Sequence, residues 1–247
     1  MLWKCERRWD AQNITKATNY ITLLDQIQQW RAPEEKVCIV TFNYDLMLEA
    51  ALSTVGVIIR SLDDYIVSDK YKLIKLHGSV NWARELETEI DSTAASHPYG
   101  VLYEIINRAS HLNVSSRYRV TSAGIHEDPL NKLAQWRLFP AITIPVQSKL
   151  DYECPGEHFE ALRAFLPEVD KLLVIGWRGA ETHFLETLAG ALKQDIRGFV
   201  VAGDLDEASE TISRLSAAGI KGGFSPFGEG FSNFVVNRAA EPLLKAY

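Results

Sequence analysis

Polar side chains that can take part in chemistry follow two apolar segments of the chain. Asn43 and Asp45 come directly after residues 36–42, and His77 follows residues 71–76. Both segments have the length and apolar content of strands. In an open parallel sheet, ligands bind beyond the carboxyl ends of the strands. We therefore expect these three side chains to converge on one bound molecule.

His77 is the candidate general base. An unperturbed imidazole titrates near pH ~6.5, so it can accept a proton at neutral pH. Gly78 follows it in the sequence, and its missing side chain would let a ligand approach closely. The structural alternatives are that Asn43 forms a turn with its own backbone and that His77 is a buried residue without a chemical role.

A second turn with a possible binding role follows the apolar segment 171–177. Gly176 and Trp177 lie there, ahead of a predicted helix. A glycine-containing turn between a strand and a helix can present backbone N–H groups to a phosphate. The structural alternative is an ordinary helix start whose partial charge Glu181 compensates.

Asp204 stands at the end of a further predicted strand, residues 198–202. A carboxylate in that position is suited to bind the hydroxyl groups of an adenosine ribose. The alternative is a loop aspartate beside a helix, with Asp206 as the residue that caps the helix.

Strands and helices alternate over most of the chain, which predicts an α/β fold with a Rossmann-like, mostly parallel sheet flanked by helices. Residues 1–247 are expected to form one domain, with an insert or small helical subdomain at about residues 84–136. Helices are predicted at 13–30, 44–54, 99–109, 129–136, 157–166, 181–192, 206–218 and 231–247, and strands at 36–42, 57–60, 71–76, 138–146, 171–177 and 198–202.

Composition limits the classes of function. The formal net charge of −6 argues against a broad surface for nucleic acid or anionic membrane. No apolar run approaches the roughly 20 residues that cross a bilayer, and the first residues do not resemble a signal peptide. We therefore expect a cytoplasmic protein. The three cysteines show neither a C-x-x-C pair nor metal-ligand spacing with the histidines, so no metal site is predicted.

The two loops together resemble the central motifs of the sirtuin-like family. The segments are Thr41-Phe-Asn-Tyr-Asp45 and Lys75-Leu-His-Gly-Ser-Val-Asn-Trp82, and they look most like the bacterial branch of NAD-cleaving defence proteins. The resemblance implies that NAD is the substrate and that Asn43 orients the nicotinamide ribose or the attacking water. His77 would be the base. Asp45 would shape the nicotinamide pocket, with Thr41 and Gly78 beside the cofactor.

The chain departs from the family pattern in three places. The segment after His77 contains none of the zinc-binding cysteines of the deacetylases, which disfavours a deacylase. Trp177 and Arg178 stand where the family's second nucleotide-binding turn has small residues. No Gly-Ala-Gly-x-Ser motif precedes Thr41, so the first βα unit is expected to be absent. A misassigned start or truncation, a partner chain that completes the site, and loss of catalysis are the open explanations.

The expectation is therefore hydrolysis of NAD to nicotinamide and ADP-ribose, with anti-phage defence by NAD depletion implied by the family branch. The rival is a catalytically inactive sirtuin-like module that binds a nucleotide or serves in oligomerisation. The protein is expected to act either as a homo-oligomer or with a partner chain, and the sequence does not choose between them. Neither nucleic acid nor a membrane is an expected partner.

Overall fold

The computed structural model describes residues 19–87, 100, 107–108, 111–121, 138–143 and 152–245. The chain divides into two compact units. Unit 1 takes Ile39–Ala50 and the described residues of Ile58–Phe159. Unit 2 takes Ala51–Val57 and the described residues of Ala17–Cys38 and Glu160–Tyr247. The single domain expected from the sequence stays a prediction.

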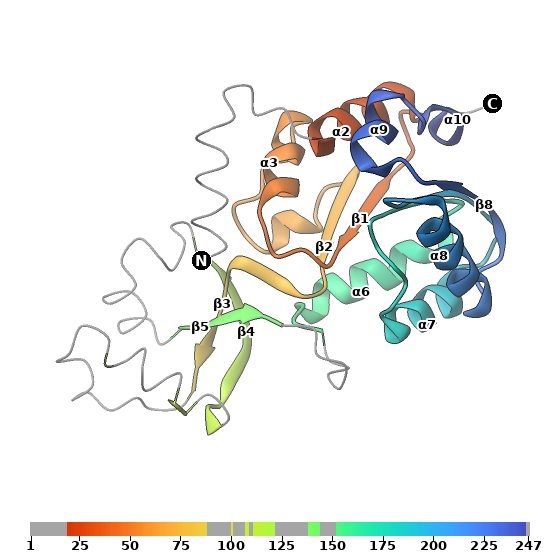
Figure 1. Ribbon diagram of the computed structural model, residues 1–247. Coiled ribbons are helices and arrows are strands. Elements are labelled where there is room, and N and C mark those ends of the chain that lie inside the picture. Colours follow the sequence, from red (N-terminus) through yellow and green to blue (C-terminus); the bar gives the residue numbers. More distant parts are fainter. Residues whose placement is uncertain are drawn as a thin grey trace. The chain divides into compact units, whose positions relative to one another are not determined.

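The strands β1 (Val37–Thr41) and β2 (Tyr71–Lys75) form a two-stranded parallel sheet, and their carboxyl ends belong to unit 1. The helix α3 (Met47–Thr54) follows β1, and the short 3₁₀ helix η1 (Asp63–Tyr65) precedes β2 (Figure 1). Both strands were expected from the sequence, and their bounds agree to within one residue at each end.

An antiparallel sheet in the order β4-β3-β5 completes the described part of unit 1. Its strands are β3 (Gly78–Leu86), β4 (Val114–Val120) and β5 (Leu138–Ile142). Trp82 pairs with Val120 on one side of β3, and Gly78 pairs with Ile142 on the other. The described residues of 84–136, where the sequence predicts an insert or small helical subdomain, lie mainly in strands, and the insert itself stays a prediction. The helices predicted within it fall mostly outside the described residues.

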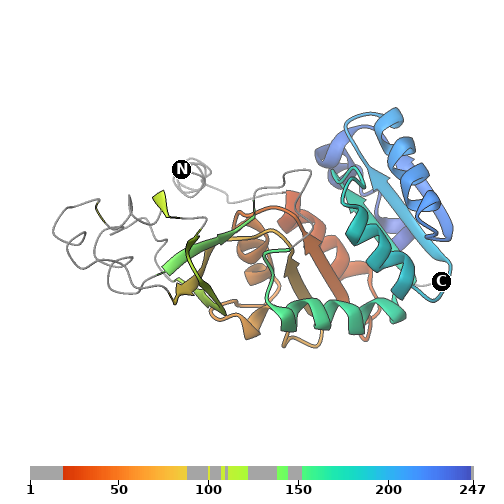
Figure 2. The same ribbon diagram turned by 90° about the horizontal axis from the view of Figure 1, so that it is seen from below.

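Unit 2 contains a parallel sheet in the order β6-β7-β8. The strands β6 (Lys171–Ile175), β7 (Ile196–Val201) and β8 (Gly222–Phe227) pair in continuous register. The helices α7 (Thr182–Ala191) and α8 (Leu205–Ala217) connect them, as the alternation in the teal-to-blue part of Figure 2 shows. Together with the β1–β2 pair, this sheet confirms the predicted α/β class with mostly parallel strands and flanking helices.

The core of unit 2 is formed where α9 (Gly230–Val236) packs on this sheet. The ring of Phe234 meets the rings of Phe199 in β7 and Phe227 in β8, with centroids 5.7 and 5.1 Å away. The helix α2 (Asn19–Trp30) packs against α9, and the buried Gln26 side chain donates a 2.8 Å hydrogen bond to the Val235 carbonyl. The remaining helices within the described residues are α6 (Gly156–Phe165), which begins in unit 1, η4 (Leu166–Glu168) and α10 (Glu241–Leu244).

The structure differs from the predicted elements in three places. Residues 57–60 form no strand, and Ile58 is 58% exposed, so this apolar run packs too little to be a strand. The strand β8 is not among the predicted strands, and it begins at Gly222, whose φ of +137° lets the chain run against the Ile196 backbone. The single helix predicted at 231–247 is replaced by two helices, α9 and α10, and Arg238 between them has a left-handed backbone (φ 55°).

Gly198, in the middle of β7, is expected to be indispensable for unit 2. A Cβ atom there would lie 2.3 Å from the Leu172 carbonyl oxygen and 2.8 Å from the Phe224 ring. Overpacking of this kind costs about 1–3 kcal/mol or more. Gly198→Ala should lower the melting temperature strongly. Gly223→Ala is the matched control in β8, where a Cβ meets nothing within 4 Å, and equal effects of the two changes would contradict the predicted packing.

Candidate functional site

The carboxyl ends of β1 and β2 lie side by side in unit 1. The backbone N–H of Leu76 donates a 3.0 Å hydrogen bond to the Thr41 carbonyl, which extends the parallel pairing beyond the last residue of β2. The chain then leaves both strands at the same edge. Asn43 follows two residues after Thr41, and His77 follows Leu76. The two loops that carry the predicted chemistry are therefore neighbours.

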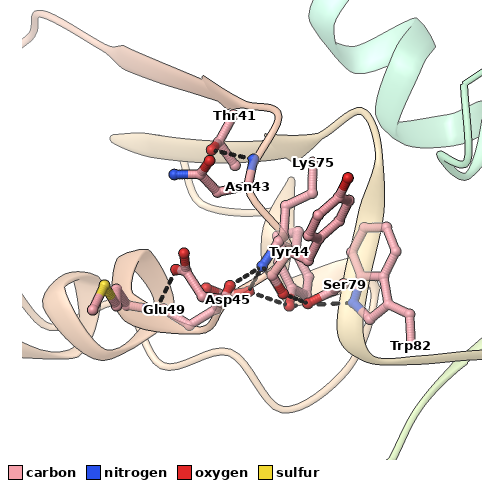
Figure 3. A network of polar contacts seen from close by, with 10 residues as sticks. Thr41, Asn43, Tyr44, Asp45, Glu49, Lys75, Ser79 and Trp82 are labelled. Atoms are coloured by element: carbon pink, nitrogen blue, oxygen red, sulfur yellow. Dashed lines mark hydrogen bonds and ion pairs between the residues drawn. The ribbon is translucent and has the colours of Figure 1, made fainter. Parts of the chain in front are cut away.

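Asn43 presents its side chain to solvent at this edge. Its backbone N–H donates a 3.1 Å hydrogen bond to the hydroxyl oxygen of Thr41, whose side chain is buried (Figure 3). Thr41 thus holds the Asn43 backbone, while the Asn43 carboxamide offers a donor and an acceptor. An exposed amide on a fixed backbone is suited to bind a hydroxyl group or a water molecule.

Asp45 is half-buried and begins the turn into α3. Its Oδ1 atom accepts a 3.0 Å hydrogen bond from the backbone N–H of Met47, the first residue of that helix. Aspartate is favoured at such a helix start because it satisfies an N–H group that has no partner within the helix. The carboxylate therefore has a structural task, besides the role in a nicotinamide pocket that the resemblance implies.

His77 lies in the short turn between β2 and β3, and it is only 7% exposed. Its ring is flanked by Phe42, 5.0 Å away between centroids, and by Tyr44 at 6.4 Å in a stacked arrangement. Its carbonyl accepts a 3.0 Å hydrogen bond from Thr143. The aromatic neighbours come from the Asn43 loop itself, so the imidazole and Asn43 share one small region. The two rings flank the imidazole.

Gly78 serves the packing of β3 on β5. It adopts φ +82°, and a Cβ atom there would lie 2.0 Å from the Ala141 carbonyl oxygen. The space that the sequence suggested for a ligand is occupied by the backbone of β5. The glycine is required at this position by its left-handed backbone and by this close approach.

The site contains a buried ion pair that the sequence analysis missed. The Lys75 side chain is 1% exposed, and its Nζ atom lies 2.8 Å from Oε1 of Glu49 in α3. The same ammonium donates to the backbone carbonyls of Asp45 and, at 3.5 Å, Tyr44 (Figure 3). The sequence did hold a signal, because Lys75 lies on the same strand face as the buried Tyr71 and Leu73. A lysine on an apolar face needs a charged partner.

Glu49 also connects this ion pair to the aromatic core of unit 1. Its Oε1 atom accepts a 2.8 Å hydrogen bond from the hydroxyl group of Tyr65, which in turn accepts one from the Trp82 indole at 3.2 Å. Burial, and then the Glu49 charge, raise the pKa of Tyr65 far above its ordinary value. Tyr65 therefore stays neutral and acts as a donor to the carboxylate.

His158, in the first turn of α6, is the other buried imidazole among the described residues of this unit and is 1% exposed. Its Nε2 atom lies 2.9 Å from the Leu62 carbonyl oxygen and is therefore the protonated nitrogen. The rings of Tyr65 and Trp82 lie 5.5 Å from it. Its Nδ1 atom is buried and has no hydrogen-bond partner among the described residues. Burial lowers the pKa of His158, opposed by the Leu62 carbonyl and by the charges of Glu157 and Asp63.

The predicted residues Gly176 and Trp177 lie in unit 2, after β6. Gly176 adopts φ +65°, and its N–H donates a 2.9 Å hydrogen bond to the Val201 carbonyl, so this group is used by the sheet. The Trp177 indole donates to the Glu181 carboxylate and packs edge-on against Phe184, with centroids 5.4 Å apart. These contacts give both residues a structural role at the start of α7.

Asp204, also in unit 2, is the N-cap of α8. Its Oδ1 atom accepts a 2.8 Å hydrogen bond from the backbone N–H of Glu207. The expectation that Asp206 caps this helix is therefore wrong, and the bond to Glu207 supports the structural alternative for Asp204. The eight predicted site residues fall into two sets, with Thr41, Asn43, Asp45, His77 and Gly78 in unit 1 and Gly176, Trp177 and Asp204 in unit 2.

A cavity of about 570 Å³ opens elsewhere in unit 1 and contains none of the predicted site residues. It is lined by Leu62, Glu85, Ser116, Arg117, Tyr118, Arg119, Pro155, Gly156 and Glu157. Its arginines face as many glutamates, so its charged groups favour neither anions nor cations. Among the residues that the structure describes, the His, Cys, Asp and Glu side chains form no group of three that could hold a metal ion.

Comparisons with known proteins give no relative for the chain. No family model matches it, and neither the curated proteins nor the solved structures include a significant match. The assignment of function therefore depends on the residues and the geometry described above.

The buried His158 should make unit 1 sensitive to acid. In the unfolded state His158 binds a proton at about pH 6.5, whereas burial lowers its pKa in the folded state. The contribution of the neutral His158 to stability is therefore complete above that pH and is lost as the pH falls below it. The free energy of unfolding then falls by at most about 1.4 kcal/mol per pH unit. His158→Gln keeps a donor for the Leu62 carbonyl and should lose less stability between pH 7 and pH 5 than the unmodified protein does.

The control for this titration is His183→Gln, because the His183 side chain is 48% exposed. Urea unfolding across the pH range measures both variants. An acid-induced loss of stability that is the same in His158→Gln and the unmodified protein would contradict the assigned role of His158.

Proposed function

We propose that the protein binds NAD at the carboxyl edge of β1 and β2 and hydrolyses it to nicotinamide and ADP-ribose. The observation that carries this proposal is the Leu76–Thr41 hydrogen bond, which makes the Asn43 and His77 loops neighbours at one strand edge. Ligands of parallel α/β sheets bind at such edges. The resemblance of both loops to the sirtuin-like family, and of the chain to its NAD-cleaving defence branch, supports the choice of substrate.

The proposed roles follow from the chemistry of each side chain and its place at this strand edge. The exposed Asn43 carboxamide orients the nicotinamide ribose and the attacking water. Water adds to the ribose carbon as the bond to nicotinamide breaks, and the His77 imidazole accepts the proton that the water loses. Asp45 holds the start of α3 and shapes one wall of the site. The residues of unit 2 are weaker candidates, because their polar groups already have protein partners.

A non-catalytic NAD-binding module is the second candidate function, and two observations favour it. His77 is only 7% exposed, and the space beside Gly78 is filled by β5. Both features restrict access of a substrate to the imidazole. A partner chain or a second copy that completes the site belongs instead to the proposal of NAD hydrolysis.

The proposed location is the cytoplasm, where NAD is available to such an enzyme. Within the described residues, none of the helices combines the length and the apolar character needed to cross a bilayer. The cytoplasmic location is proposed from the sequence, whose first residues do not resemble a signal peptide.

Release of nicotinamide from NAD by the purified chain tests the proposal, with Asn43→Ala as the decisive variant. The Asn43 side chain is exposed, so its removal should change the melting temperature little while it lowers turnover by about 100-fold, the usual scale for a lost positioning contact. Asn237→Ala, at an exposed asparagine of unit 2, is the matched control and should keep full turnover.

Two results would separate the candidates. Absence of turnover with an NAD-dependent rise in melting temperature would overturn hydrolysis and support the binding module. Absence of both would overturn NAD as the ligand.

A further inference from the structure

The Lys75 ammonium is buried in unit 1 with three acceptors around it, and a position in a strand does not require such a charged group. An ammonium is a donor of three hydrogen bonds without any acceptor. The three acceptors are Glu49 Oε1 at 2.8 Å and the successive carbonyl oxygens of Tyr44 and Asp45. Burying a charge is costly unless it is paired and hydrogen-bonded. An apolar residue would fill this position without that cost.

The two carbonyls belong to the loop that presents Asn43. The Tyr44 carbonyl also accepts hydrogen bonds from the Val80 N–H at 2.9 Å and the Ser79 hydroxyl at 3.3 Å. On the other side of Asn43, its own N–H is held by the Thr41 hydroxyl. The backbone is therefore fixed before and after Asn43, and Lys75 supplies the charged contact on the helix side.

We propose that Lys75 is a positioning residue that fixes the Asn43 side chain for substrate through the Tyr44 and Asp45 carbonyls. The inference rests on the proposed function, because it assigns Asn43 a ligand. Glu49 is the counter-ion that keeps the ammonium in place and so acts one contact further away. Lys75 does not touch the substrate, since its donors are all taken by the protein.

The test uses the double variant Lys75→Met/Glu49→Gln in the full chain. Methionine fills the space of the lysine stem, and glutamine keeps an acceptor for the Tyr65 hydroxyl, so no buried charge is stranded. The proposal predicts a melting temperature close to that of the unmodified protein but a kcat for nicotinamide release about 100-fold lower, with KM changed less than about 3-fold. If Lys75 had only a structural role, the double variant would have both the melting temperature and the kcat of the unmodified protein.

The control is Lys72→Met in the same strand. The Lys72 ammonium also donates to a backbone carbonyl, that of Ile66, which lies outside the Asn43 loop. This variant should keep the kcat of the unmodified protein. An equal fall in kcat for both substitutions would overturn the positioning role.

Amide hydrogen exchange over residues 42–46 gives a readout that needs no activity. Faster exchange in this loop of the double variant, with unchanged exchange in Lys72→Met, is the expected result. If the unmodified protein releases no nicotinamide, hydrolysis fails while this measurement still decides whether Lys75 fixes the loop. Exchange in residues 42–46 that is the same in the double variant and the unmodified protein overturns the proposal.

Discussion

The charge of Lys75 inside unit 1 is the constraint on which the local structure depends. A buried ammonium requires a counter-ion and acceptors for its remaining hydrogen bonds. Glu49 supplies the counter-charge from α3, and the Tyr44 and Asp45 carbonyls supply acceptors from the loop after β1. One side chain of β2 therefore connects that loop to the following helix. Tyr65 and Trp82 extend the same network into the core of the unit.

This constraint gives the candidate site its character. The loop is held from within, so Asn43 can project into solvent on a backbone that does not need its side chain. The buried His77 is packed by aromatic rings of the same loop. Preorganised polar groups of this kind suit the binding of a transition state, because little reorganisation is needed when the substrate arrives. Access to His77 is then the property that separates an enzyme from a binding module.

Sequence periodicity predicts the parallel elements well, because apolar strands alternate with amphipathic helices between residues 156 and 217. The same reasoning fails where neighbours decide the structure. The residues of β8 are not β-branched, so the sequence does not predict a strand there, and they form a strand because they pair with β7. Gly78 was interpreted as room for a ligand, but the Ala141 carbonyl that fills this room lies far along the chain. Asn43 and His77 are candidates that local sequence suggests, whereas the contact of Glu49 with Lys75 is visible only in the fold.

The most direct measurement of this account is a double-mutant cycle between Lys75 and Glu49, from urea unfolding of Lys75→Met, Glu49→Gln and the double variant. Each single change leaves one buried charge without its partner, which costs about 3–5 kcal/mol. The double variant strands no charge and should unfold close to the unmodified protein, so we expect a coupling free energy above about 3 kcal/mol, beyond the usual range for residues in one network. A coupling below about 0.5 kcal/mol would show that the two charges do not stabilise each other. The Asn43 loop would then be held by its other contacts alone.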